Sequence, residues 1–372
     1  MRRTRGRVVH VESLADFDAR IGSGARTLTG WRVRGLDLSG RGEVLDRCQV
    51  AGASFLGCTL AAGQGTRLTA AGALVLPAIP DVPVDVYRSR LYTAEELYAA
   101  TGTGAVGGRY AESLDGHAYA WSQHAFDPTK AMAQALHDHA IDQALEAWLP
   151  GRRVAGVMGG HALQRGSAGY AAAARLGREL GRAGLVVATG GGPGAMEAAN
   201  LGARLAGVDD RELATVLDQL AAVPSYRPDI DAWARVAFEV CRRHPAAGAS
   251  LGIPTWHYGH EPPNVFATEV AKYFRNAVRE AILVQICDAG IAFLPGAGGT
   301  VQEIFQDGCE NYYADESSVA PMVLVGERYW TEQVPAWPLL RSLARGRSME
   351  QRVHLVDSVP DAAALLAAGH QA

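Results

Sequence analysis

Short apolar runs alternate with longer stretches of helical periodicity through the second half of the chain, beginning at Arg152. The first two apolar runs read VAGVMGG and LVVATGGG. Further strands are expected over Ala249–Ile253, Gly290–Leu294, Pro321–Val325 and Val353–Val356, with helices over Phe266–Ile286, Thr300–Tyr312 and Asp361–Ala368. Strands that alternate with helices pair in parallel through right-handed crossovers. The pattern therefore predicts an α/β fold, a doubly wound, Rossmann-like parallel sheet over residues 151–372.

The N-terminal region follows a different pattern, because Leu45, Val50, Phe55 and Leu60 recur every five residues. A period of five fits neither a helix nor a strand, but it is similar to the pentapeptide-repeat coil, a narrow β-solenoid. Plain hairpins are the alternative. We expect a β-rich region over residues 1–84 that serves packing or oligomerisation.

A helical connector is expected over residues 85–150. Thr93 and Glu96 form a capping box at the start of a helix from about Ala94 to Ala100. A longer periodic run extends from Asp127 to Trp148 and predicts a packing helix.

Composition narrows the classes of partner. The net charge of −4 and a pI near 6.3 give no basic field for nucleic acid. No run of 18 apolar residues suggests a membrane span, and the N-terminal arginines precede no apolar stretch, so we expect a cytoplasmic protein without a membrane partner. The five cysteines lack metal-ligand spacing, so no metal is expected.

Three predicted strands run into polar or glycine-rich loops. These loops are Gly159-Gly160-His161, Gly190–Gly194 and Gly296–Thr300. Glycine allows close approach of a ligand to the backbone, and a helix that starts directly afterwards offers free N–H groups to a phosphate. Ligands of open α/β sheets bind outside the carboxyl ends of the strands. We therefore expect a phosphate-bearing ligand at these loops.

Two common nucleotide sites do not fit the loops. The second loop is not GxGxxG and follows the second strand, which argues against NAD or FAD. The only lysines, Lys130 and Lys272, follow no glycine loop, which argues against a nucleoside triphosphatase and against a pyridoxal-dependent decarboxylase. No cofactor is expected.

Residues 152–372 resemble the Lonely Guy (LOG) family, long mislabelled as lysine decarboxylases. The family signature PGGxGTxxE is matched by Pro295–Glu303, preceded by a helix that carries Arg279. A second family motif resembles GGGPGAMEAAN, which includes Met196. The chain departs from the family at Ala297, which replaces the second glycine of PGG, and in an insertion over about 208–248, with two predicted helices, that compact members lack.

The resemblance implies a nucleoside 5′-monophosphate phosphoribohydrolase, which releases free base and ribose 5-phosphate. It implies Glu303 and Arg279 as catalytic residues and a homo-oligomer, a dimer or larger. The phosphate- and nucleotide-binding residues it implies are Gly159, Gly160, Gly190, Gly191, Gly192, Gly194, Met196, Gly296, Gly298, Gly299 and Thr300. The partner is then a nucleoside monophosphate.

Other interpretations stay open at this point. The same fold serves non-catalytic nucleotide-binding proteins and carriers of the molybdenum cofactor. Thr300 and Glu303 have the spacing of a capping box, so Glu303 could serve only its helix. Arg279 could be an exposed, salt-bridging arginine. His257 and His260 lie three residues apart beside Glu261, but Gly259 and Pro262 argue against a helical metal-ligand pair.

Overall fold

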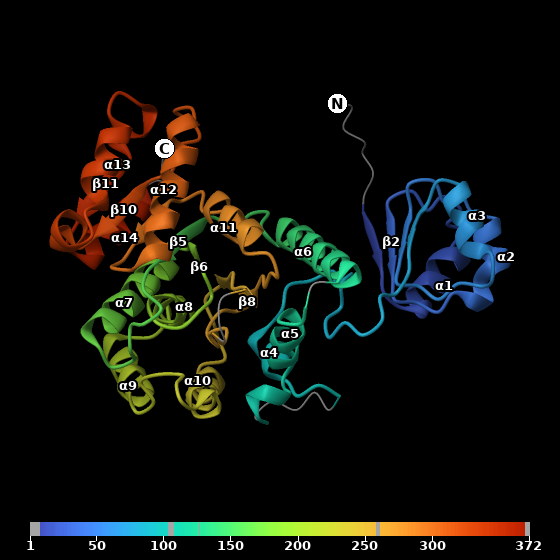
Figure 1. Cartoon of the computed structure of the whole chain (residues 1–372), viewed down its shortest axis with the longest axis horizontal. Coiled ribbons are helices and arrows are strands. Elements are labelled where there is room, and N and C mark those ends of the chain that lie inside the picture. The colour runs from blue at the N-terminus through green and yellow to red at the C-terminus, as the bar shows by residue number, and fades with distance from the viewer. Residues whose placement is uncertain (1–7, 103–107, 126, 258–260, 369–372) are drawn as a thin grey trace. The chain divides into compact units, whose positions relative to one another are not determined.

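A computed structural model of the chain describes residues 8–102, 108–125, 127–257 and 261–368 (Figure 1). The described residues fall into two compact units. One lies within Met1–Ser89 and Phe126–Ala140, and the other within Arg90–Ala125 and Ile141–Ala372.

The second unit contains a seven-stranded sheet in the order β11-β10-β9-β5-β6-β7-β8, in which every neighbouring pair is parallel. Its strands are β5 (Val154–Met158), β6 (Val186–Thr189), β7 (Ser250–Gly252), β8 (Glu269–Val270), β9 (Ile291–Phe293), β10 (Met322–Val325) and β11 (Val353–Val356). The predicted α/β fold with a parallel, Rossmann-like sheet is confirmed.

Helices cover both faces of this sheet (Figure 1). One group consists of α7 (Ala168–Arg182), α8 (Ala195–Arg204) and α14 (Val359–Ala368), and the other of α11 (Asn276–Gln285), α12 (Gly298–Tyr313) and α13 (Ala336–Ala344). From β5 the chain proceeds through β6 and β7 to β8 on one side, then crosses to β9 on the other. The strand order therefore reverses between β5 and β9, which is where open α/β sheets bind ligands.

The insertion forms two helices as predicted, α9 (Asp210–Ala221) and α10 (Ile230–Arg243). The segment before α11 differs from the prediction, because a helix was expected to start at Phe266. Residues Glu269–Val270 instead form β8 on the edge of β7, and Val270 exchanges two backbone hydrogen bonds with Tyr92. This pairing holds the backbone extended, so the helix begins only at Asn276.

The first unit contains a four-stranded parallel sheet, β1 (Val9–Val11), β2 (Trp31–Arg34), β3 (Ser54–Leu56) and β4 (Leu74–Leu76). Helices α1 (Leu14–Gly22), α2 (Gly42–Asp46) and α3 (Gln64–Ala70) connect consecutive strands. Val9 pairs with Trp31, Arg32 with Ser54 and Ser54 with Leu74, so one strand and one helix recur every 20 to 22 residues. Such stacked repeats form a solenoid.

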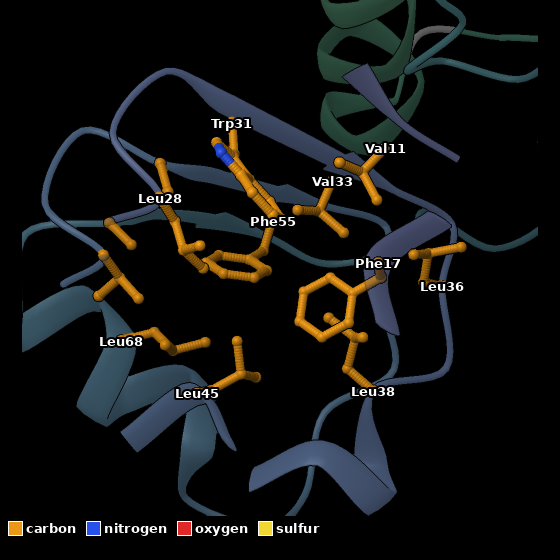
Figure 2. Packing of buried hydrophobic residues seen from close by; sticks show 13 residues of the cluster. Val11, Phe17, Leu28, Trp31, Val33, Leu36, Leu38, Leu45, Phe55 and Leu68 are labelled. Carbon is orange, nitrogen blue, oxygen red and sulfur yellow. The ribbon is translucent and has the colours of Figure 1, made fainter. Parts of the chain in front are cut away.

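This repeat corrects the expected five-residue coil, and the parallel pairing excludes hairpins. Leu45 lies on α2 and Phe55 on β3, while Val50 and Leu60 lie in the connections, so the five-residue spacing crosses different elements. All four nevertheless belong to one apolar core. Figure 2 shows Leu45 and Phe55 within it, and Phe17 meets Trp31 edge to face with ring centres 6.2 Å apart.

The expected connector over 85–150 is not a unit of its own. Helices α4 (Ala94–Tyr98) and α5 (Leu114–Ser122) belong to the second unit, whereas α6 (Pro128–Trp148) contributes residues to both. Thr93 caps α4 by accepting a 3.2 Å hydrogen bond from the Glu96 N–H, as the sequence predicts.

Candidate functional site

The three loops predicted from the sequence meet at the reversal of strand order. The Gly160 N–H donates to the Pro295 carbonyl at 3.1 Å, which joins the loop after β5 to the loop after β9. The Ala195 N–H donates to the Gly160 carbonyl at 3.1 Å and adds the loop after β6. These bonds make one continuous backbone rim at the carboxyl ends of β9, β5 and β6.

The N-terminus of α12 is the open part of this rim. Gly298 and Gly299 are exposed, and a Cβ on either would meet no atom within 4 Å. The first N–H groups of a helix have no intrahelical partner and carry the positive end of its dipole. No side chain caps this helix. The position suits a phosphate group.

Ala297 is the N-cap of α12 and the one departure from the PGG signature. Its φ of −99° lies outside the left-handed region, so alanine is accommodated without strain. Gly296 is the more demanding position, since a Cβ there would overlap Thr300 Oγ1. The Tyr329 hydroxyl donates to the Gly296 carbonyl at 2.7 Å and fixes the turn from the other side.

Glu303 faces Arg279 rather than the start of its helix. Because α12 begins at Gly298, with Ala297 as its N-cap, Thr300 and Glu303 do not form a capping box. The carboxylate Oε1 of Glu303 lies 3.6 Å from Arg279 Nη1, and both side chains are only 12% exposed. The family resemblance and the geometry therefore select the same pair of residues.

Arg279 is fixed by two backbone carbonyls. Its Nε donates to the Ile253 carbonyl at 2.7 Å and its Nη2 to the Gly190 carbonyl at 3.4 Å. The guanidinium thus connects the ends of β6 and β7 and leaves Nη1 directed to Glu303. An exposed, mobile arginine is excluded by this geometry.

Burial raises the pKa of Glu303 to about 7, while the nearby Arg279 opposes the shift and Glu280 adds to it. A carboxyl group with a pKa near neutrality can both accept and donate a proton at physiological pH. This property distinguishes Glu303 from an ordinary surface glutamate.

Glu303 should also make stability depend on pH. Its folded-state pKa lies above the ordinary value of 4.5, so the folded protein binds the proton more tightly than the unfolded chain. This contribution is complete below about pH 4.5, is lost as pH rises to about 7, and totals about 3 kcal/mol. Urea denaturation at pH 5 and pH 8 should show a larger loss for wild type than for Glu303→Gln; parallel losses would contradict the assignment.

The loop Gly190–Gly194 mainly positions other groups. Gly191 and Gly194 have φ values of +70° and +75°, which favour glycine. The Gly191 N–H donates to Thr189 Oγ1 at 3.0 Å, and its carbonyl accepts from the Asn264 N–H at 2.8 Å. The predicted phosphate contact from the Gly191 amide is therefore not available, and neither is that of Gly160, which bonds Pro295.

Other predicted glycines allow close packing. A Cβ on Gly159 would lie 2.9 Å from Ala195 Cβ, and one on Gly190 would overlap Arg279 Nη2. Met196 is half-buried, and its side chain lies beside Gly190 and Gly192. Of the predicted binding residues, those with free approach are Gly298 and Gly299, with buried Thr300 beside them.

Sequence reasoning did not identify Asn264, which is buried and holds the second loop. Its Nδ2 donates to the Gly192 carbonyl at 3.2 Å and to Asn200 Oδ1 at 3.0 Å. The residue follows Glu261 in the run EPPN, whose paired prolines were the only local indication of a fixed loop. Tyr329 and Ile253 act on the site through the backbone, and no residue pattern announces such roles.

Within the described residues, no group of three or more His, Cys, Asp or Glu side chains could hold a metal ion. His260, considered above beside His257, lies outside them. None of the helices in the described parts of the chain is long and apolar enough to cross a membrane.

No protein-family model and no curated protein matches this chain. Two solved structures that are similar to it are the molybdenum cofactor binding protein from the phototrophic bacterium Rippkaea orientalis and the Moco carrier protein from Chlamydomonas reinhardtii. Each aligns with 59% of this chain and 98% of its own, with a TM-score of 0.37 and identities of 17% and 18%, respectively. The function is therefore argued from the geometry of the site.

Proposed function

We propose that the chain is a nucleoside 5′-monophosphate phosphoribohydrolase of the LOG type, as the resemblance in its sequence implies. The observation that carries the proposal is Glu303, a buried carboxyl group with a pKa of about 7, held against Arg279 one to two turns from the open N-terminus of α12. A phosphate site and an acid–base group thus occur at one end of one helix.

In the proposed reaction, the free N–H groups at the start of α12 hold the 5′-phosphate. The bond between C1′ and the base nitrogen breaks with its electron pair leaving on the base, through an oxocarbenium-like state. Water forms the new bond to C1′, and Glu303 accepts its proton. Arg279 balances the charge of Glu303 and orients it.

A non-catalytic carrier of a nucleotide or of the molybdenum cofactor is the second candidate. The observation that favours it is the same ion pair, because a carboxylate that already faces an arginine could be structural and leave the loops to supply affinity. A carrier should tolerate loss of Glu303, whereas the hydrolase should not. The proposed homo-oligomer stays a prediction, whichever candidate holds.

A chromatographic screen of purine and pyrimidine monophosphates, without added metal, tests the proposal. We expect release of free base and ribose 5-phosphate in equal amounts from at least one of them. Tight nucleotide binding with no free base would reject the hydrolase and support the carrier.

Gly298→Pro tests the phosphate position. Proline is tolerated at the first helical residue, and the extended conformation of Ala297 permits it, so the change removes one free N–H with little effect on the helix. We expect affinity for nucleoside monophosphate to fall about tenfold, the value of one hydrogen bond to a charged group. Titration calorimetry should show no such loss for the matched control Gly298→Ala, which keeps the N–H and meets no atom within 4 Å. Equal affinities of the two variants would place the phosphate elsewhere.

A further inference from the structure

A cavity of about 270 Å³ adjoins the proposed phosphate site. The loop after β5 contributes His161 and Gln164, and the loop after β6 contributes Pro193 and Gly194. The opposite wall comes from the insertion through Tyr226, Arg227 and Trp233. Ligand pockets for small molecules begin at about 300 Å³, so the cavity suits one heterocyclic ring system and is too small for a dinucleotide.

The insertion wall is fixed in place by Arg165. The Arg165 N–H donates to the Pro224 carbonyl at 3.1 Å, and its Nη1 donates to the Trp233 carbonyl at 3.1 Å. The guanidinium also forms an ion pair with Glu197, and both side chains are 1% exposed. A buried pair with further hydrogen bonds gives a defined geometry, so this wall is preformed rather than a loose flap.

Polar and aromatic side chains converge on the cavity. Tyr226 and Trp233 meet edge to face with ring centres 6.2 Å apart, and the Arg227 guanidinium lies 5.4 Å from the centre of the Tyr226 ring. Glu261 also lines the cavity, and its Oε1 lies 3.8 Å from His161 Nε2. Burial and then the Glu261 carboxylate raise the pKa of Tyr226, which agrees with the closeness of these two groups.

We infer that this cavity is the base pocket of the nucleotide site and that it selects bases that carry an amino group, an inference that rests on the proposed nucleotide ligand. Glu261 is the recognising group, because a carboxylate only accepts hydrogen bonds and an exocyclic amino group donates them. Tyr226 and Trp233 supply the apolar wall for the ring. The insertion therefore determines specificity.

The consequence is a preference within pairs of bases that differ in an amino group. A site built for a hydrogen-bonding group rejects a ligand that lacks it, since its own polar group is left unpaired. Guanine should be preferred over hypoxanthine, and cytosine over uracil.

The test measures binding by calorimetry with the Glu303→Gln chain, so that substrate is not consumed. GMP should bind about tenfold or more tightly than IMP, and CMP more tightly than UMP. Glu261→Gln added to that chain should abolish the preference, and Tyr226→Ala should weaken all monophosphates. The matched control is Asp218→Asn, an exposed carboxylate on α9 outside the cavity, which should change neither.

The outcomes separate the two proposals. Binding with the predicted preference, together with no base release by the wild-type chain, would support the base pocket and reject the hydrolase. Base release with no preference, or with a preference that survives Glu261→Gln, would overturn the base pocket and leave the hydrolase intact. Absence of any monophosphate binding would overturn the base pocket as well.

Discussion

Glu303→Gln is expected to reduce kcat for base release about 100- to 10,000-fold, the usual contribution of a positioned acid–base group. The substitution keeps the size of a side chain that is only 12% exposed, but glutamine cannot accept the proton from water. The affinity for nucleoside monophosphate should stay within a few-fold of wild type, because the open N–H groups of α12 are untouched. Single-turnover assays together with calorimetry measure the two effects.

The matched control is Glu310→Gln, an exposed glutamate two turns further along the same helix. It should retain wild-type kcat. A Glu303→Gln chain that still turns over at a comparable rate would show that the Arg279–Glu303 pair is structural, as the carrier interpretation requires.

Arg279→Ala is expected to lower kcat/KM about 100- to 1,000-fold, in line with loss of one fixed electrostatic partner in a water-poor site. Arg279 holds the pKa of Glu303 below the value that burial alone would set. Its removal should therefore raise this pKa above about 7 and move the acidic limb of the kcat profile to higher pH. A pH–rate profile separates this effect from a general loss of folding, which would lower activity at every pH.

Gly190→Ala tests the same arginine without removing it. The added Cβ would overlap Arg279 Nη2 and lie 2.7 Å from Met196 Sδ, so the guanidinium must move. Displacement of such a group by about 1 Å costs on the order of 100-fold in rate. Gly207→Ala is the control, since its Cβ would meet nothing within 4 Å. Unchanged activity in Gly190→Ala would show that the position of Arg279 is not critical.

Much of the second unit was readable from its sequence because its strands are buried on both faces and end in glycines. β5, β6 and β10 coincide closely with apolar runs. The pairing of Glu303 with Arg279 followed from the family resemblance, and neither residue type nor spacing alone would have selected it. The two-residue strand β8 was missed because its Glu269 and Val270 show no periodicity and are held by partners distant in sequence.

The first unit was misread because the five-residue spacing was short and the true repeat is long. Val33, Phe55 and Val75 lie side by side in the parallel sheet, 20 to 22 residues apart. Gly30, Gly52 and Gly72 recur at the same spacing, each with a positive φ just before a strand. These glycines were the available indication of a strand–helix repeat, whereas Leu45 and Phe55 only share a core.

The position of the insertion has a consequence for how such a protein can diverge. Because β6 and β7 are adjacent in the sheet, the length of the crossover between them is not constrained by strand order. Residues 208–248 can therefore be exchanged or lengthened while the sheet and α12 stay the same. Ligand choice and the chemical step can then change independently, and we expect a chain with a transplanted crossover to keep its fold and acquire a different preference.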